Sequence, residues 1–522
     1  MKCCAYGCWC VIRVIKGIVF MPWRGWTVGV LSVGLTILMW SAVLPAATPT
    51  PGGTLAIAVP DEPPGLDPTT SPAAAIARIV YNNLLEGLVK VNMRGEVVRA
   101  LAEQYSVSID GTVYTFTLRR GVKFHNGRSL RAEDVKFTLE RNLDPKTGHP
   151  HRAYYEDVQD IKVVDERTVH IALRKPNAMF VFNLARANSA IVAKEEVERL
   201  KSHPIGTGPL QLSEWVRGDR ITLTKFKDYY EPGVPSLDKV VFRFIQDPSA
   251  QLAALRAGDV DVIGAGMNPE SAVELKRDPQ FRVIEGLTTT DVIVAMNNSK
   301  PPFSDMRVRR AITYAINRDE VIKGAVFGMA QPIGSHMDPL NPYYVDLSRL
   351  YEYDPEKAKQ LLTEAGYPQG FEFILRLAEP YLAYRRAGEI IANQLAKVGL
   401  QAKIEIIEWG QWLARIYRQA DYDMTVMGHA EPFDIGIYAN PQYYFRYDNP
   451  KLQALIAAAD ASLDDVQRKA LYEQVQRIIA DDAVNVFLYN GPYLVGMRNT
   501  VHNWWTHLPI PAIDVTGVYK TK

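Results

Sequence analysis

The sequence predicts an α/β protein with a separate β-rich region and an apolar leader. Three observations support this prediction. Strands of four to six apolar residues alternate with amphipathic helices in the second half, residues from Leu101 to Leu173 follow a β pattern, and an uncharged apolar run lies near the N-terminus. The chain has 522 residues, 47% of them hydrophobic and 22% charged, a globular composition that suits about two to four domains.

The first 47 residues have the pattern of a secretory signal peptide. Basic residues precede the apolar run Trp26–Leu44, and small residues follow it. We therefore expect residues 1–47 to be a signal peptide that is cleaved near Ala46 or Ala47. The alternative is a membrane anchor, because nineteen apolar residues can just span about 30 Å of hydrocarbon.

Charge and cysteine content exclude several classes of function. A formal net charge of +1 provides no strongly basic face for nucleic acid. All four cysteines lie within the first ten residues, so the rest of the chain has no thiol nucleophile, thiolate ligand or disulfide. No cysteine follows the apolar run, which argues against a lipid anchor.

Translation starts at Met1 or at Met21, and the second start would leave a leader of ordinary length.

The first half of the body combines an α/β segment with the β-rich region. Thr54–Pro60 is predicted to be a strand, and residues 73–89 a helix whose apolar residues form one stripe. The β pattern of residues 101–173 is interrupted by one predicted helix at residues 132–143, which has acidic residues at its start. We therefore expect a β-rich region with one helix here.

The second half has the pattern of α/β lobes with buried sheets. Predicted helices cover residues 249–258, 307–326, 355–366 and 386–399, with apolar strands between them. Three of these helices end in glycine, as helix C-termini often do.

Motifs that carry catalysis are absent from the sequence. We find no phosphate-binding loop, no Gly-x-Ser-x-Gly elbow and no His-Glu-x-x-His helix. His149 and His151 are the one close histidine pair, and we interpret them as solvated loop residues. The sequence therefore predicts no catalytic residue, no metal site and no cofactor.

Several long stretches resemble a known family. They include YNNLLEGLV, LAEQYSVSIDGTVYTFTLRRGVKFHNGRSLRAEDVKFTLER, HPIGTGPLQLSEW, LDKVVFRFIQDPSAQLAALRAGDVDV, NNSKPPFSDMRVRRAITYAINRDEVI and YDPEKAKQLLTEAGY. These stretches resemble the extracellular solute-binding proteins of the oligopeptide, dipeptide and nickel type, family 5, which feed ABC importers. The resemblance runs from about Thr54 to about Pro492. One departure is Arg131, where the family usually has Thr.

The resemblance implies a periplasmic-binding-protein-like (type II) two-lobed clamp with an additional β-rich accessory domain. The first lobe would comprise residues 50–87, 205–292 and 495–522, the accessory domain residues 88–204, and the second lobe residues 293–494. Chain crossings near residues 290–294 and 490–494 would form the hinge. The implied partners are a peptide or small-molecule ligand and the permease and ATPase subunits of the importer. We expect a monomer in the periplasm that binds no nucleic acid.

The resemblance also points to ligand-binding residues. In peptide-binding relatives, a Gly-Trp pair precedes a loop whose aspartate receives the ammonium group of the peptide. Here Gly428 is followed by His429, and Glu431 and Asp434 are the acids that could take this role. Replacing Trp by His removes a stacking face and adds a group that titrates near pH 6.5.

Four further residues match positions that approach the ligand in relatives. They are Thr70, Ser71, Trp409 and Trp412. Each tryptophan could equally be a packing residue. The sequence therefore predicts an import receptor; the alternatives are a secreted hydrolase acting on peptides or small conjugates, or a sensory or chaperone-like module on the same fold.

Overall fold

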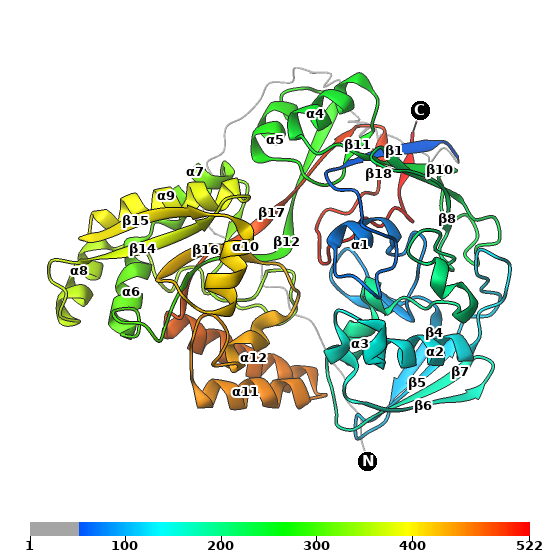
Figure 1. Cartoon of the computed structure of the whole chain (residues 1–522), viewed down its shortest axis with the longest axis horizontal. Coiled ribbons are helices and arrows are strands. Elements are labelled where there is room, and N and C mark those ends of the chain that lie inside the picture. The colour runs from blue at the N-terminus through cyan, green and yellow to red at the C-terminus, as the bar shows by residue number, and fades with distance from the viewer. Residues whose placement is uncertain (1–51, 522) are drawn as a thin grey trace, which may run out of the picture. The chain divides into compact units, whose positions relative to one another are not determined.

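The computed structural model describes residues 52–521 (Figure 1). The predicted signal peptide, its cleavage site and the four cysteines lie outside these residues. These described residues belong to one compact unit. No helix within residues 52–521 is both long and apolar enough to cross a bilayer.

One mixed sheet of eleven strands organises most of the molecule. Its order is β15-β14-β16-β12-β17-β11-β1-β10-β9-β8, and β13 pairs with β17. The strands are β1 (Thr54–Val59), β8 (Leu210–Val216), β9 (Arg220–Lys225), β10 (Lys239–Phe244), β11 (Val262–Ile263), β12 (Phe281–Met296), β13 (Gln331–Pro332), β14 (Phe371–Ala378), β15 (Leu400–Ile407), β16 (Met424–His429) and β17 (Asn485–Arg498). The predicted strand at residues 54–60 is confirmed.

Strands β12 and β17 run side by side along the middle of this sheet (Figure 1). Their antiparallel register continues from Phe281 to Leu287 on β12, breaks, and resumes at Asp291. On the other side of the break, β12 also pairs with β16. A register break adds unpaired backbone and local twist, so it is the natural place for two halves of the ladder to change their relative orientation.

Helices cover both faces of the sheet around β14. They are α6 (Met306–Ala315), α7 (Arg318–Val326), α8 (Pro355–Glu364) and α9 (Leu382–Ala396). Helices α7 and α9 lie on one face, and α6 and α8 on the other (Figure 1). The single helix expected at residues 307–326 is wrong. The first helix ends at Ala315, and Asn317 begins the second, because its side chain accepts the backbone N–H of Glu320 as an N-cap.

The remaining helices of the large sheet begin at similar caps. They are α4 (Pro248–Ala257), α5 (Pro269–Leu275), α11 (Pro450–Ala461) and α12 (Asp465–Asp481). Asp247, Asn268 and Asn449 each accept a backbone N–H from the first turn, and a proline follows each of them. Gly258 ends α4 with φ of 89°, which a residue with a side chain rarely adopts.

A second, antiparallel sheet has the order β4-β5-β7-β6. Its strands are β4 (Ala102–Val107), β5 (Val113–Leu118), β6 (Val158–Asp165) and β7 (Thr168–Leu173). Helix α2 (Ala132–Leu143) packs against β6 and β7, at the bounds that the sequence predicts. Alternate residues of β5 and β7 are buried beneath it, which gives this sheet its own hydrophobic core.

The remaining elements are short. They are α1 (Ala74–Val80), β2 (Val89–Val91), β3 (Val97–Arg99), α3 (Phe180–Leu184), α10 (Trp409–Gln411), β18 (Val501–His502) and β19 (Tyr519–Lys520). Of these, β2-β3 and β18-β19 form two-stranded sheets of their own. The predicted helix at residues 73–89 is wrong beyond Val80. Tyr81 is extended there because its hydroxyl donates to the carbonyl of Ala185 and accepts the N–H of Val91.

Candidate ligand-binding site

The loop after β16 lines four neighbouring cavities. Pro432 or Phe433 lies in the wall of each, together with residues distant in sequence. The largest cavity has a volume of about 610 Å³, within the roughly 300–1,000 Å³ typical of small-molecule sites. The smallest of the four has about 10 Å³, room for about one water-sized group. This loop is therefore the centre of the candidate site.

Four separate segments meet beside this loop. β16 ends at His429, and its pairing with β12 places Asp291 directly opposite. His336 lies in the segment after β13, and Asp434 begins a short 3₁₀-helix at residues 434–439. The sheet register therefore brings together side chains that are about a hundred residues apart in sequence.

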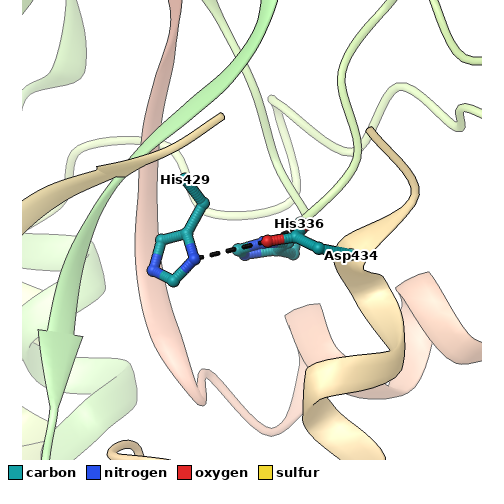
Figure 2. Close-up of side chains that lie close together, drawn as sticks. All are labelled: His336, His429 and Asp434. Carbon is teal, nitrogen blue, oxygen red and sulfur yellow. Dashed lines mark hydrogen bonds and ion pairs between the residues drawn. The ribbon is translucent and has the colours of Figure 1, made fainter. Parts of the chain in front are cut away.

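His336, His429 and Asp434 form a buried polar cluster (Figure 2). The Nε2 of His336 lies 2.9 Å from Oδ1 of Asp434, and the Nδ1 of His429 lies 3.4 Å from Oδ2. The two imidazole rings meet edge to face with centroids 4.8 Å apart. The carboxylate thus lies between two histidines that come from different segments.

The far nitrogen of each imidazole is held by a tyrosine hydroxyl. Nδ1 of His336 lies 3.1 Å from the hydroxyl of Tyr438, which also accepts a hydrogen bond from Asn485. Nε2 of His429 lies 2.9 Å from the hydroxyl of Tyr444. Because both ends of each ring have a partner, the rings are fixed with one nitrogen directed at Asp434.

Burial and pairing have opposite effects on this cluster. Burial raises the pKa of Asp434, but the two histidines lower it by more, so the net pKa is well below the usual range. Burial lowers the pKa of His429, and its hydrogen bond to Asp434 offsets part of that effect. Asp434 is therefore an ionised carboxylate at neutral pH.

Two further carboxylates line the 10 Å³ cavity beside Asp434. Asp291 is 4% exposed, and its Oδ1 has no hydrogen-bond partner among the described residues. Asp338 is 5% exposed and accepts the backbone N–H of Leu340. Burial raises the pKa of both groups, to about 7 for Asp338, and nearby carboxylates add to the rise. The cavity therefore has an excess of acidic groups.

Glu431 is paired across the candidate site. Its carboxylate lies 2.8 Å from Nη1 of Arg186, a residue 245 positions away in the chain. Arg186 also donates to the carbonyl of Pro432. The Glu431 side chain is 56% exposed, whereas that of Asp434 is 20% exposed. The two loop acids thus have different surroundings: one is an exposed bridge and the other belongs to a buried cluster.

The two predicted hydroxyl residues, Thr70 and Ser71, differ in their position relative to the four cavities. Ser71 lines the same cavity as Arg186 and Glu431, and its hydroxyl accepts the backbone N–H of Ala73. Thr70 is exposed and lines none of the four cavities. Ser71 is therefore close to the predicted acids, and Thr70 is farther from the cavity walls.

The two predicted tryptophans stack on each other. Their ring centroids lie 5.1 Å apart, and the indole of Trp412 donates to the hydroxyl of Thr425. Trp412 also packs edge to face against Tyr444, the partner of His429. Neither Trp409 nor Trp412 lines the four cavities. Trp412 therefore contacts the tyrosine that binds His429, and Trp409 contacts Trp412.

The sequence reasoning missed Asp291, His336 and Arg186. Asp291 was visible as an acid directly before the apolar run Val292–Met296, a position at which a polar group is often buried. His336 and Arg186 lie in irregular segments without a pattern that relates them to residues 428–434. The interpretation of His149 as solvated is also wrong. It is 6% exposed, and its Nε2 lies 3.0 Å from the carbonyl oxygen of Asn188.

Comparisons with known proteins agree with this architecture. Residues 96–454 match the profile of the family described as bacterial extracellular solute-binding proteins, family 5 middle. The chain is 30% identical to the glutathione-binding protein GsiB of Salmonella choleraesuis over 424 residues, which cover 77% of this chain and 82% of that protein. It is also 30% identical to the dipeptide-binding protein of Escherichia coli K12, over 91% of this chain and 96% of that protein.

Two solved structures show similar folds. The periplasmic binding protein DppA of Helicobacter pylori, in complex with the peptide STSA, has a TM-score of 0.75 and 29% identity, with 90% of this chain and 99% of that chain covered. AgaA of A. tumefaciens R10, in complex with agropinic acid, has a TM-score of 0.73, 29% identity and the same coverage. The type II binding-protein fold predicted from the sequence is confirmed. The chain belongs to the bacterial extracellular solute-binding proteins of family 5, the receptors of ABC importers.

Proposed function

We propose that this receptor captures a peptide or another small organic solute with a cationic group, in the periplasm, and delivers it unchanged to the permease. The observation that carries the proposal is the loop at residues 430–435, which lines four cavities and connects both walls through the Glu431–Arg186 pair. The names of relatives that bind dipeptides and glutathione support the same class of solute.

The charges of the largest cavity favour a cationic group on the solute. Its wall contains four acids and two bases. Lys175 pairs with Asp157, and Arg186 pairs with Glu431, which leaves Asp434 and Asp460 without a basic residue from this wall. A buried carboxylate that faces a cavity is stabilised by an ammonium or guanidinium group placed there. Asp434 is the better candidate, because its side chain is 20% exposed, whereas Asp460 is an exposed residue of α11.

The division into lobes is part of this proposal. Residues 50–87, 205–292 and 495–522 would form the first lobe and residues 293–494 the second, with residues 88–204 as the accessory domain. The register break of the β12–β17 ladder, between Leu287 and Asp291, supports a hinge near residue 290. Two rigid lobes that close on a solute bury most of its surface.

Closure of the two lobes on a solute should be visible as a change in the radius of gyration. Because rigid lobes rotate about the hinge, saturating solute should reduce the radius of gyration while the far-ultraviolet circular dichroism spectrum stays the same. Small-angle X-ray scattering with and without solute measures this change. An unchanged radius of gyration at saturation would contradict closure.

The function itself is tested by the solute that the protein retains. We expect protein purified from the periplasmic fraction to carry a small organic solute that native mass spectrometry identifies. After release and re-addition, the same solute should be recovered chemically intact, because the family binds substrates and the site is proposed to perform no reaction. Recovery of a cleaved product would instead support the hydrolase alternative, which the comparisons do not favour.

A further inference from the structure

We propose that His336, His429 and Asp434 bind one divalent transition-metal ion of the Zn²⁺ type beside the solute cavities. This site shares Asp434 with the proposed solute anchor, but it is inferred from the cluster itself and is tested without any solute. No motif in the sequence indicates this site, because its members come from three segments that meet only in the folded chain.

The spacing of the donor atoms supports metal binding. The three ligand atoms all lie within 4.8 Å of one another. In a tetrahedral zinc site with bonds of about 2.0–2.1 Å, ligand atoms are about 3.3 Å apart. Nδ1 of His429 lies 3.4 Å from Oδ2 of Asp434, and Nε2 of His336 lies 2.9 Å from Oδ1, so the two histidines approach different oxygens of one carboxylate. Metal binding therefore requires the three donors to move together, from a spacing of up to 4.8 Å to about 3.3 Å.

The surroundings orient both imidazoles as in known metal sites. A metal-binding histidine usually has a hydrogen-bond partner on its other ring nitrogen, which fixes the ring and its tautomer. Tyr438 and Tyr444 are these partners for His336 and His429. Tyr438 is itself held by Asn485. The rings are thus preorganised with Nε2 of one and Nδ1 of the other directed at the carboxylate (Figure 2).

Asp291 is an independent observation that points to a cation. It lines the same 10 Å³ cavity as His336 and Asp434, is 4% exposed, and has an oxygen without a hydrogen-bond partner among the described residues. Asp338 and Glu431 are further carboxyl groups in the wall of this cavity. A cation next to Asp291 and Asp338 would stabilise their ionised forms, which burial disfavours.

The donor set indicates which metal is bound. Two imidazoles and one carboxylate suit zinc, nickel, copper or cobalt, whereas calcium and magnesium prefer sites made of oxygen ligands. Three protein ligands leave at least one coordination position open. The neighbouring cavity provides space for about one water-sized group at that position. Zn²⁺ is therefore the first probe, and Co²⁺ its spectroscopic substitute.

The experiment titrates the metal alone, without any solute. It uses the full chain with Cys3, Cys4, Cys8 and Cys10 replaced by serine, so that no leader thiol can bind Zn²⁺. After the protein is stripped with a chelator, isothermal titration calorimetry should show one Zn²⁺ bound per chain. Co²⁺ should produce visible absorption bands of a low-symmetry site with nitrogen and oxygen ligands.

Variants assign the binding to this cluster. His429→Gln should reduce Zn²⁺ affinity by more than about 100-fold, because outer partners alone change affinity by about 10–100-fold. Tyr444→Phe keeps all three ligands and should reduce the affinity by about 10-fold. His203→Gln, at an exposed histidine outside the cluster, is the matched control and should bind Zn²⁺ like the parent.

The outcomes separate a metal site from a purely internal hydrogen-bond network. Absence of Zn²⁺ binding, or binding that survives both His429→Gln and Tyr444→Phe, would overturn the proposal. Circular dichroism identifies any variant that fails to fold, and Tyr444→Phe, which removes a single oxygen, provides the second test in that case. Failure here leaves solute capture untouched, because no solute is present in the titration.

Discussion

Asp434→Asn is expected to weaken binding of a peptide with a free ammonium group by about 30-fold or more. Truncating one member of a desolvated charge pair typically costs about 2–5 kcal/mol, and about 1.4 kcal/mol corresponds to a factor of ten. Asp434 is 20% exposed and is an ionised carboxylate beside the 610 Å³ cavity. Calorimetry in the presence of a chelator measures this loss without a contribution from metal.

Two comparisons make this result specific. The N-acetylated form of the same peptide lacks the ammonium group and should bind equally to the parent and to Asp434→Asn. Glu431→Gln should reduce the affinity less than Asp434→Asn, because the Glu431 carboxylate is 56% exposed and exposed ion pairs contribute at most about 1 kcal/mol. Equal binding of the free peptide by the parent and by Asp434→Asn would show that this carboxylate is not the anchor.

In the parent, the free energy of unfolding should fall by about 3 kcal/mol between about pH 4.5 and 7 because of Glu86, and Glu86→Gln is expected to abolish this fall. Glu86 is 1% exposed and accepts hydrogen bonds from the hydroxyls of Thr207, Tyr229 and Tyr230. Burial raises its pKa from the ordinary 4.5 to about 7, although Lys90 and the hydroxyls lower it in part. Each unit of pKa difference between folded and unfolded chain corresponds to about 1.36 kcal/mol.

Glu86 makes the protein less stable as the pH rises, because its pKa is raised in the folded state. The folded protein holds the proton of Glu86 more tightly than the unfolded chain does. This stabilisation is fully present below pH 4.5 and is lost as the pH rises through about 7. Relative to the parent, Glu86→Gln should therefore gain free energy of unfolding between about pH 4.5 and 7, and little beyond.

Urea unfolding at several pH values measures this difference. The slope with pH is the readout, because a constant offset between Gln and Glu does not affect it. Glu389→Gln, at an exposed position of α9, serves as the control and should parallel the parent at every pH. Parallel curves for Glu86→Gln as well would show that Glu86 is ionised in the folded protein throughout this range.

Local signals in the sequence were sufficient for many elements. Helix α2 begins at Ala132 and ends at Leu143 as predicted, because Glu133 and Asp134 in its first turn and its apolar stripe are both local features. The boundary of α1 could not be found in this way. There Tyr81 bonds to Ala185, more than a hundred residues away, and this contact determines the backbone more strongly than helical periodicity does.

In the candidate site, too, local patterns in the sequence indicate some residues, whereas others meet only in the folded chain. The acidic loop and His429 follow a strand whose end is visible in the sequence, and the resemblance to a family directed attention to them. Asp434 and His336 meet across 98 residues, and Glu431 and Arg186 across 245. Such contacts depend on sheet order and register, which a single sequence does not determine. The prediction left Glu431 and Asp434 equivalent, whereas their burial differs.

A hinge at the register break of the β12–β17 ladder, as proposed above, would make this receptor suitable as the frame of an optical sensor. Hydrogen-bonded strands on both sides of the break keep each half stiff, so solute binding would be converted mainly into one rotation. Gly111, between β4 and β5, lies against Leu463, between α11 and α12, so fluorophores placed nearby would separate when the halves open. Ile109 and Val466 are exposed attachment points, and a body without native cysteine allows both to be labelled through introduced thiols.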